Sequence, residues 1–193
     1  MKGEDSIDEV FCYAGDISGY KNILLSLSPE EQQVRIREFR ELIKNATSEY
    51  GFQDSFINVS DTLFVIAKNN KEELKRLLKF SGYMLENGIK MALPIRGAID
   101  FGFAKIDKEN NLIYGKAAAE AYTLAEQQDW IGTCCAENSI GSFINHENIE
   151  KSSLPYICEL WDPNLVLVYP VPMKDGKVLF RPAISHWSSV KDI

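Results

Sequence analysis

"EVFCYAGDISGYKNIL", residues 9–24, joins an apolar run to an aspartate that lies between two glycines. The β-branched, aromatic and small apolar residues of 9–14 predict a strand that is covered on both faces. Asp16 stands where this strand ends, with Gly15 before it and Gly19 shortly after it. A carboxylate in this position is either a turn residue that bonds its own backbone or a ligand held at the edge of a rigid strand. The elements around Asp16 have to decide between these two interpretations.

The composition indicates one acidic globular domain. A length of 193 residues suits a single domain, and 45% hydrophobic residues are enough to fill a core. The 21 Lys and Arg against 28 Asp and Glu give a net charge of -7, and no basic run interleaved with aromatic residues offers a track for a phosphate backbone. We therefore expect residues 1–193 to form one domain that does not bind polymeric nucleic acid.

Cysteine spacing and the lack of long apolar segments predict a cytoplasmic protein. The four cysteines show no C-x-x-C spacing, and Cys134 and Cys135 are adjacent, which suits packed thiols better than disulfides. We find no apolar leader and no run of about 18 apolar residues, and so expect no membrane partner. Because His146 and His186 are the only histidines, a bound metal would be held mainly by oxygen.

Two long helices are predicted in the first half of the chain. Ser28 and Glu31 form a capping-box pattern, and apolar residues then recur with helical spacing until Gly51. Residues 70–88 predict a second amphipathic helix, which we expect to end at Gly88. Both helices should dock an apolar face on a sheet.

The strands around these helices complete an α+β pattern. Residues 55–67 contain two β-rich runs separated by Ser60 and Asp61, which predicts a hairpin with the aspartate near its tip. Residues 89–106 predict a further strand, which Pro94 and Gly97 interrupt at a bulge or at a sheet edge. The resulting β-α-β-β-α-β order is typical of a ferredoxin-like fold, an antiparallel sheet with helices on one face.

The C-terminal part is expected to add β structure to this core. Residues 114–130 are alanine-rich and predict a third helix, while the residues after them alternate short apolar runs with turns. Pro170 and Pro172 place their segment at a sheet edge or outside the sheet. We divide the domain into a core of about residues 9–135 and a β-rich extension of about residues 136–193.

This topology can bring Asp16 and Asp61 together. The end of the first strand and the tip of the adjacent hairpin can lie side by side, where two bare carboxylates would repel each other unless a cation lay between them. Mg²⁺ or Mn²⁺ favours such oxygen ligands and keeps positions open for water and nucleotide phosphates. Gly15 and Gly19 would let phosphates approach backbone N–H groups. The alternative is that the aspartates belong to two unrelated turns.

Four segments resemble the motifs of the class III nucleotidyl cyclases, in the order of that family. FCYAGDISGYKN (11–22) resembles the family's opening strand and first metal-binding aspartate, and FINVSDTLFVIA (56–67) resembles its hairpin, with Ser60 in place of a glycine. IRGAIDFG (95–102) matches the length of its Arg-apolar-Gly strand, and IYGKAAAEAYTLAE (113–126) resembles its glycine-led, alanine-rich helix. The resemblance spans about residues 9–128.

The resemblance implies a metal-dependent cyclisation of a nucleoside triphosphate. Asp16 and Asp61 match the two metal-binding aspartates, and the carbonyl of Ile17 matches a further metal contact. The family holds two Mn²⁺ or Mg²⁺ ions in each active site, and the ribose 3′-hydroxyl attacks the α-phosphate and expels pyrophosphate. Its active sites lie at the interface of a head-to-tail homodimer.

Four positions depart from the purine cyclases of this family. The base-reading positions fall on Ile57 and Leu112, which cannot form hydrogen bonds with a purine edge. The Asn and Arg with which the family binds ribose and stabilises the transition state fall on Ala119 and Thr123. The chain is therefore either a catalytically inactive, nucleotide-binding homodimer or a divergent cyclase with rearranged cations. Retention of both metal aspartates favours the divergent cyclase.

Lys116 and Arg96 are the candidates for the missing positive charge. Lys116 shares a helix face with Ala119 and Thr123, although a solvated lysine at a helix start explains it equally well. Arg96 either faces the nucleotide or pairs with Asp100, which has the same parity on the same strand.

The C-terminal segment LVLVYPVPMKDGKVLFRPAISHW (165–187) resembles the ending of the bacterial Pycsar pyrimidine cyclases. This implies conversion of UTP or CTP into cyclic UMP or cyclic CMP, a second messenger of anti-phage defence that activates a separate effector. UTP is favoured on family frequency alone, and an adenylyl or guanylyl cyclase is a further alternative. Tyr20 and Tyr50 are candidates to stack on the pyrimidine, with Gly19 beside the nucleotide.

Overall fold

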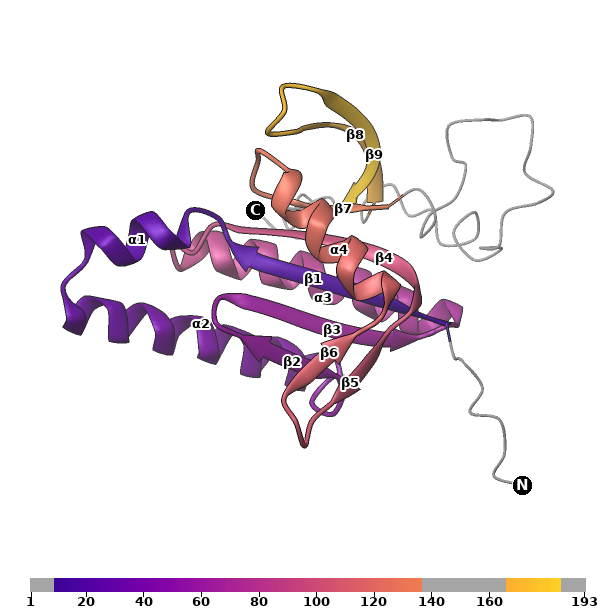
Figure 1. Ribbon diagram of the computed structural model, residues 1–193, viewed down its shortest axis with the longest axis horizontal. Coiled ribbons are helices and arrows are strands. Elements are labelled where there is room, and N and C mark those ends of the chain that lie inside the picture. The colour runs from indigo at the N-terminus through magenta and orange to yellow at the C-terminus, as the bar shows by residue number, and fades with distance from the viewer. Residues whose placement is uncertain (1–8, 137–165, 185–193) are drawn as a thin grey trace, which may run out of the picture.

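The computed structural model describes residues 9–136 and 166–184, whose strands form a seven-stranded sheet and a small separate hairpin. The large sheet contains β1 (Glu9–Ile17), β2 (Phe56–Val59), β3 (Thr62–Lys68), β4 (Ile95–Phe103), β7 (Thr133–Cys135), β8 (Val166–Pro172) and β9 (Val178–Ile184). The hairpin consists of β5 (Lys105–Asp107) and β6 (Leu112–Tyr114). The strand order in the large sheet is β2-β3-β1-β4-β7-β9-β8 (Figure 1), and the sheet is mixed because β7 runs parallel to β4.

Helices cover both faces of the large sheet. They are α1 (Tyr20–Ser26), α2 (Pro29–Glu49), α3 (Lys71–Lys90) and α4 (Lys116–Gln127). Successive side chains of β1 point to opposite faces, so Phe11 and Tyr13 pack in the core with α2 and α3, whereas Cys12 and Ala14 pack against the alanines of α4. The predicted α+β class and β-α-β-β-α-β order are confirmed; the expected antiparallel sheet with helices on one face holds for β2-β3-β1-β4 with α2 and α3, whereas β7 is parallel to β4 and α4 covers the second face.

The start of α2 agrees with the sequence prediction, whereas the end of α3 differs from it. Ser28 caps α2 by accepting from the Glu31 N–H at 3.3 Å, and the Glu31 carboxylate accepts from the Ser28 N–H at 2.8 Å, as the capping box predicts. The prediction that Gly88 ends α3 is wrong, because the helix continues to Lys90. A Cβ on Gly88 would lie 2.7 Å from the carbonyl oxygen of Leu93, so this glycine permits close approach of the returning chain.

The strand after α3 is central and regular. The predicted bulge or edge at Pro94 and Gly97 is wrong, since Pro94 precedes β4 and its carbonyl accepts from the Ser18 N–H at 2.7 Å. Gly97 is paired with Gly15 of β1 on one side, and β7 pairs with β4 on the other. The ring of Tyr13 covers both glycines, and a Cβ on Gly97 would lie 2.6 Å from Tyr13 Cε2. These glycines therefore make room for a buried tyrosine.

The described part of the C-terminal extension continues the sheet. β9 pairs with β7, and β8 pairs along the whole length of β9 as the outer strand. Pro170 and Pro172 lie in β8, which confirms their predicted place at a sheet edge. His146, Cys158 and His186 lie outside the described residues.

Cys12, Cys134 and Cys135 are buried and free, and burial raises the pKa of the Cys134 thiol to about 12. Within residues 9–136 and 166–184, no helix combines the length and the apolar character that a membrane crossing requires.

The packing of Tyr13 on Gly97 gives a testable stability difference. We expect Gly97→Ala to lower the free energy of unfolding by about 1–3 kcal/mol, because the new methyl overpacks a rigid strand. Gly82→Ala is the matched control, since its Cβ would meet Ile184 at an ordinary 3.5 Å and alanine favours the helix by about 0.5–1 kcal/mol. Urea unfolding of both variants measures the difference, and equal midpoints would contradict this account of Gly97.

Candidate functional site

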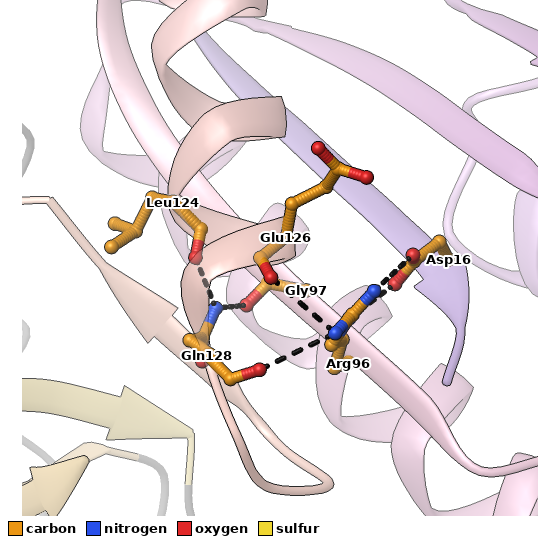
Figure 2. Close-up of polar contacts among 6 residues, drawn as sticks. All are labelled: Asp16, Arg96, Gly97, Leu124, Glu126 and Gln128. Carbon is orange, nitrogen blue, oxygen red and sulfur yellow. Dashed lines mark hydrogen bonds and ion pairs between the residues drawn. The ribbon is translucent and has the colours of Figure 1, made fainter. Parts of the chain in front are cut away.

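Asp16 forms a buried ion pair with Arg96 at the end of β1. The two residues lie directly opposite each other in the β1–β4 register. Arg96 donates from Nε to Asp16 Oδ1 at 2.8 Å and from Nη2 to Asp16 Oδ2 at 2.7 Å (Figure 2). Their side chains are only 10% and 11% exposed. A bidentate, charge-assisted pair of this kind fixes both side chains, and the hydrogen bond from Arg96 to Asp16 raises the pKa of Arg96.

The end of α4 completes the surroundings of Arg96. Arg96 Nη1 donates to the carbonyls of Glu126 at 3.4 Å and Gln128 at 3.3 Å, while the Glu126 carboxylate extends away from the ion pair (Figure 2). The fully buried Gln128 donates from Nε2 to the carbonyls of Gly97 at 2.9 Å and Leu124 at 3.1 Å. The guanidinium is therefore held by β1, β4 and the end of α4 together.

The predicted Arg96–Asp100 pair is wrong, because the carboxylate partner of Arg96 is Asp16. Two residues of the same parity on one strand share a face, but a separation of four residues places them about 13 Å apart along it. Asp100 lies opposite Cys12, and its Oδ1 accepts from the Phe101 N–H at 2.8 Å. Cross-strand register, which the sequence does not reveal locally, decides the partner.

Asp61 occupies the tip of the β2–β3 hairpin, beside the end of β1. Thr62 pairs with Asp16 across β3 and β1, so Asp61 is one residue from this cross-strand pair. Ser60 adopts a left-handed conformation with φ of 57°. Asn58 Nδ2 donates to the carbonyls of Ser60 at 3.2 Å and Thr62 at 3.0 Å. This side chain closes the turn on either side of Asp61.

The electrostatics also connect Asp61 with the ion pair. Partial burial raises the pKa of Asp61 above its ordinary range, and the negative charge of Asp16 adds to this rise. Hydrogen bonds from its own N–H and from Ser60, together with the charge of Arg96, oppose it. Asp61 thus lies within the fields of both Asp16 and Arg96, and its own charge is only partly compensated.

The oxygen ligands at this position fit a hard divalent cation. Asp16 and Asp61 supply carboxylates, and Ile17 is the last residue of β1. Arg96 occupies one lone pair on each Asp16 oxygen, and a carboxylate offers about four. No group of three or more His, Cys, Asp and Glu side chains suited to a metal occurs among residues 9–136 and 166–184. A metal here would take its other ligands from backbone, water or phosphate.

The structure places Tyr20 and Gly19 near this site and Tyr50 in the helix layer. Burial raises the pKa of Tyr20, and the negative charge of Asp61 adds to the rise. Gly19 precedes α1 with φ of 75° and has open space where a Cβ would lie. Tyr50 ends α2, and its ring contacts Phe80 with a centroid distance of 6.3 Å, which favours a role in core packing.

The other predicted site residues lie on or near α4. Ile57 is buried in the α4-side core, and Leu112 of β6 is 51% exposed. Lys116 begins α4, where its Nζ lies 3.6 Å from a carboxylate oxygen of Glu120. Glu126, whose carbonyl meets Arg96, lies about 15 Å farther along the helix axis. Within one chain the structure therefore does not bring Lys116 to Asp16.

Tyr122 was missed by the sequence analysis. Burial raises the pKa of Tyr122, and a hydrogen bond with Glu126 and the charges of Asp16 and Asp61 add to it. Its ring packs near Phe64, with a centroid distance of 6.2 Å. The signal was the i, i+4 spacing of Tyr122 and Glu126, which places them on one helix face.

Two lysines near Thr123 were also missed. A cavity of about 570 Å³ lies between α4 and the β8–β9 turn, and it is lined by Thr123, Glu126, Gln127, Met173, Lys174, Asp175, Lys177 and Leu179. The Lys174 N–H donates to the carbonyl of Gln127 at 2.8 Å, which fixes the turn against α4. Lys177 pairs with Asp175 at 2.6 Å. Lys174 and Lys177 therefore line the same cavity as Thr123, together with the acidic residues Glu126 and Asp175, and the two lysines of the turn MKDGK were the available signal.

Comparison with solved structures identifies the fold. The adenylyl cyclase CyaB from P. aeruginosa matches with a TM-score of 0.62 and 12% identity, over 96% of this chain and 97% of that one. A dimeric guanylyl cyclase domain of the RhoGC fusion protein from Blastocladiella emersonii matches with a TM-score of 0.64 and 12% identity, over 92% and 97%. The guanylate cyclase domain of RhGC from Catenaria anguillulae, solved with GTP, matches with a TM-score of 0.62 and 11% identity, over 93% and 97%. The chain therefore has the class III nucleotidyl cyclase fold.

Sequence comparison adds no closer relative, since no family model and no curated protein matches the chain.

The buried ion pair makes Arg96 a stability determinant. We expect Arg96→Ala to lower the free energy of unfolding by about 3–5 kcal/mol, because it leaves the Asp16 carboxylate buried without its partner. The double variant Asp16→Leu/Arg96→Met should regain most of this loss, since it removes both charges and keeps similar volume. Urea unfolding measures both variants. A loss below about 1 kcal/mol for Arg96→Ala would contradict the role given to the pair.

The raised pKa of Asp61 predicts a pH-dependent stability. The folded state binds a proton on Asp61 more tightly than the unfolded state does, so stability falls as the pH rises from near 3.8 through the raised pKa. With EDTA present at pH 7, Asp61→Asn should raise the melting temperature, and this gain should vanish below about pH 3.8. The control Asp54→Asn, whose side chain is fully exposed, should show no such pH-dependent gain. A gain that persisted at low pH would contradict the assignment.

Proposed function

We propose that the chain is a nucleotide cyclase that converts UTP or CTP into a 3′,5′-cyclic nucleotide and pyrophosphate, as a homodimer with two Mn²⁺ or Mg²⁺ ions in each active site. The observation that carries this proposal is the placement of Asp16 and Asp61 beside each other, at a strand end and a hairpin tip. Rigid strand ends hold carboxylates in a fixed geometry, which a metal-assisted phosphoryl transfer requires. The shared fold of adenylyl and guanylyl cyclases supports the reaction type as an analogy.

The residues of the chain divide the work of such a reaction. Asp16, Asp61 and the Ile17 carbonyl would hold the divalent ions, which when bound neutralise the triphosphate and lower the pKa of the ribose hydroxyl. Arg96 orients Asp16 through both carboxylate oxygens. Its Nη1 donates to the carbonyls of Glu126 and Gln128, which leaves one Nη2 hydrogen for a single contact with a phosphate. Among the described residues, Arg96 is the cation that contacts the proposed metal ligand Asp16 directly.

Other cations would complete the phosphate surroundings. Lys174 and Lys177 line the cavity that includes Thr123, where the resembling family has its transition-state arginine. Lys116 would contribute only from a partner protomer, because within its own chain it lies at the far end of α4. Distributing charge over Arg96 and the lysines replaces one arginine by several cations.

The choice of a pyrimidine rests on the two base-reading positions. Ile57 is buried and Leu112 is half-exposed, and neither side chain can donate to or accept from a purine. Tyr20 lies within the field of Asp61 and is the better placed of the two tyrosines to stack on a base. UTP is favoured over CTP on the frequency within the resembling family alone.

The resemblance of residues 165–187 to the Pycsar cyclases extends the proposal to a biological role. A cyclic pyrimidine nucleotide would be a second messenger of anti-phage defence, and a separate effector would respond to it. The described part of this segment, β8 and β9, brings Lys174 to the cavity beside α4.

A second candidate function is a non-catalytic, nucleotide-binding homodimer. It is favoured by the bidentate contact of Arg96 with both oxygens of Asp16, because a resident cation already neutralises the first proposed metal ligand. Ala119 and Thr123 also lack the groups that stabilise charge in the transition state. In this case the protein would bind a triphosphate without turnover.

One assay separates these functions. Purified protein is incubated with Mn²⁺ and each of UTP, CTP, ATP and GTP, and the products are identified by mass spectrometry. We expect a cyclic pyrimidine nucleotide and pyrophosphate, and a loss of at least about 100-fold in Asp61→Asn, because removal of one preorganised group that stabilises transition-state charge costs about 10²–10³ in rate. Asp54→Asn is the control for a lost surface charge and should retain activity.

The other outcomes of this assay are also decisive. Faster cyclisation of ATP or GTP would overturn the assignment of a pyrimidine substrate. It would show that Ile57 and Leu112 do not exclude a purine. Binding of a triphosphate without any product would support the second candidate.

A further inference from the structure

A second cavity lies between α2 and the edge strand β2. Its volume is about 390 Å³, and its lining includes Arg40, Ile43, Lys44, Thr47, Phe56 and Asn58. This volume lies within the range of about 300–1,000 Å³ that is typical of small-molecule sites. None of Asp16, Asp61 and Arg96 lines it, so it is distinct from the candidate metal site.

The charges around this cavity are all positive. Arg40 and Lys44 lie one helical turn apart on α2 and line the same side, and none of the lining residues is acidic. Among the residues that the structure describes, none forms an ion pair with Arg40 or Lys44. Two adjacent cations without a carboxylate give this cavity a positive potential that attracts anions. The chain as a whole has a net charge of -7, so this positive potential is local.

The interior of the cavity is apolar. Ile43 is 4% exposed, and Phe56 packs partly against the main core. Thr47 is buried, and its hydroxyl already donates within α2, to the carbonyls of Ile43 at 2.8 Å and Lys44 at 3.2 Å. A ligand would therefore meet hydrocarbon from Ile43, Thr47 and Phe56 below a cationic rim. This combination selects an apolar body that carries one anionic group.

The wall of the cavity is connected to the turn that carries Asp61. Asn58 lines the cavity, and its Nδ2 holds the carbonyls on both sides of Asp61, those of Ser60 and Thr62. A ligand that shifts Asn58 must therefore shift or loosen this turn.

We propose that this cavity is an effector site for a small amphipathic anion, a carboxylate or phosphate monoester or diester with an apolar body, and that Asn58 couples its occupancy to Asp61. The anionic group would lie between Arg40 and Lys44, with the apolar body against Ile43 and Phe56. Binding itself does not depend on the proposed cyclase function, whereas the coupling rests on Asp61 as a metal ligand. Linkage makes the effect reciprocal, so a metal at Asp61 changes effector affinity by the same factor.

Calorimetric titration tests the binding. Octanoate and 3′,5′-cyclic UMP serve as anionic probes, while octanol supplies a body without charge and inorganic phosphate supplies charge without a body. We expect at least one anionic probe to bind at least about tenfold more tightly than octanol and phosphate. Arg40→Ala/Lys44→Ala should weaken that probe at least about tenfold, since it removes both cations.

A matched control keeps this test specific. Lys75→Ala/Lys79→Ala removes two exposed lysines with the same i, i+4 spacing on α3, and it should leave probe binding unchanged. Preference for octanoate would indicate a lipid-like carboxylate, and preference for cyclic UMP would indicate feedback by a nucleotide product. Failure of both probes to bind, or equal weakening by both double variants, would overturn the site.

The coupling has a separate readout that needs no turnover. The affinity of the protein for Mn²⁺ is measured by electron paramagnetic resonance with and without the probe that binds. We expect a change of at least about threefold in wild type and its loss in Asn58→Ala. An unchanged Mn²⁺ affinity in wild type would overturn the coupling, while probe binding would still stand. Absence of Mn²⁺ binding altogether would instead contradict the metal site of the proposed function.

Discussion

The ion pair between Asp16 and Arg96 is the interaction on which both the fold and the site depend. Placing two charges at about one-tenth exposure costs several kcal/mol for each ion unless geometry and further hydrogen bonds offset it. Here the offset needs β1 and β4 to be adjacent and in register, and it needs the end of α4 to present the carbonyls of Glu126 and Gln128. Gly15 and Gly97, paired in that register, leave room for the large ring of Tyr13 over both strands. Packing of the core around Tyr13 and orientation of the Asp16 carboxylate thus depend on the same β1–β4 register.

The same pair divides the two aspartates into different roles. Asp16 is already neutralised and oriented by Arg96, so its position does not depend on a metal. Asp61 is raised in pKa by burial and by Asp16, and lies in a turn with a left-handed serine. Local strain and uncompensated charge are typical of residues retained for function rather than for stability. A cation at this end of the sheet would relieve most repulsion at Asp61, which makes the hairpin tip the responsive half of the site.

The sequence predicted what local patterns encode and failed where distant segments meet. Periodicity and capping located α2, the hairpin at Asp61 and the order of the core elements, because these follow from residues within one or two turns. The end of α3 was predicted wrongly, because Gly88 is required by the close approach of the Leu93 carbonyl and does not end the helix. The partner of Arg96 was predicted wrongly because the alternation of side chains along a strand shows which residues share a face of the sheet. It does not show which residue of the adjacent strand lies opposite. Lys174 was missed because its approach to α4 depends on the pairing of β9 with β7.

The meeting of α4 with the β8–β9 turn bears on the missing transition-state arginine. A positive charge needed at one point can come from a side chain on any element that reaches that point. Thr123 in place of the family's arginine removes only the charge that α4 would supply. The turn that carries Lys174 is fixed to the end of α4 by a backbone hydrogen bond, so its position is set by the same helix end that holds Arg96. Three cations on a strand, a turn and a partner protomer require three elements to be positioned correctly. A single arginine on α4 requires only that helix to be positioned. Because the end of α4 accepts hydrogen bonds from both Arg96 and the Lys174 N–H, the proposed rearranged phosphate site would need fewer independently placed elements.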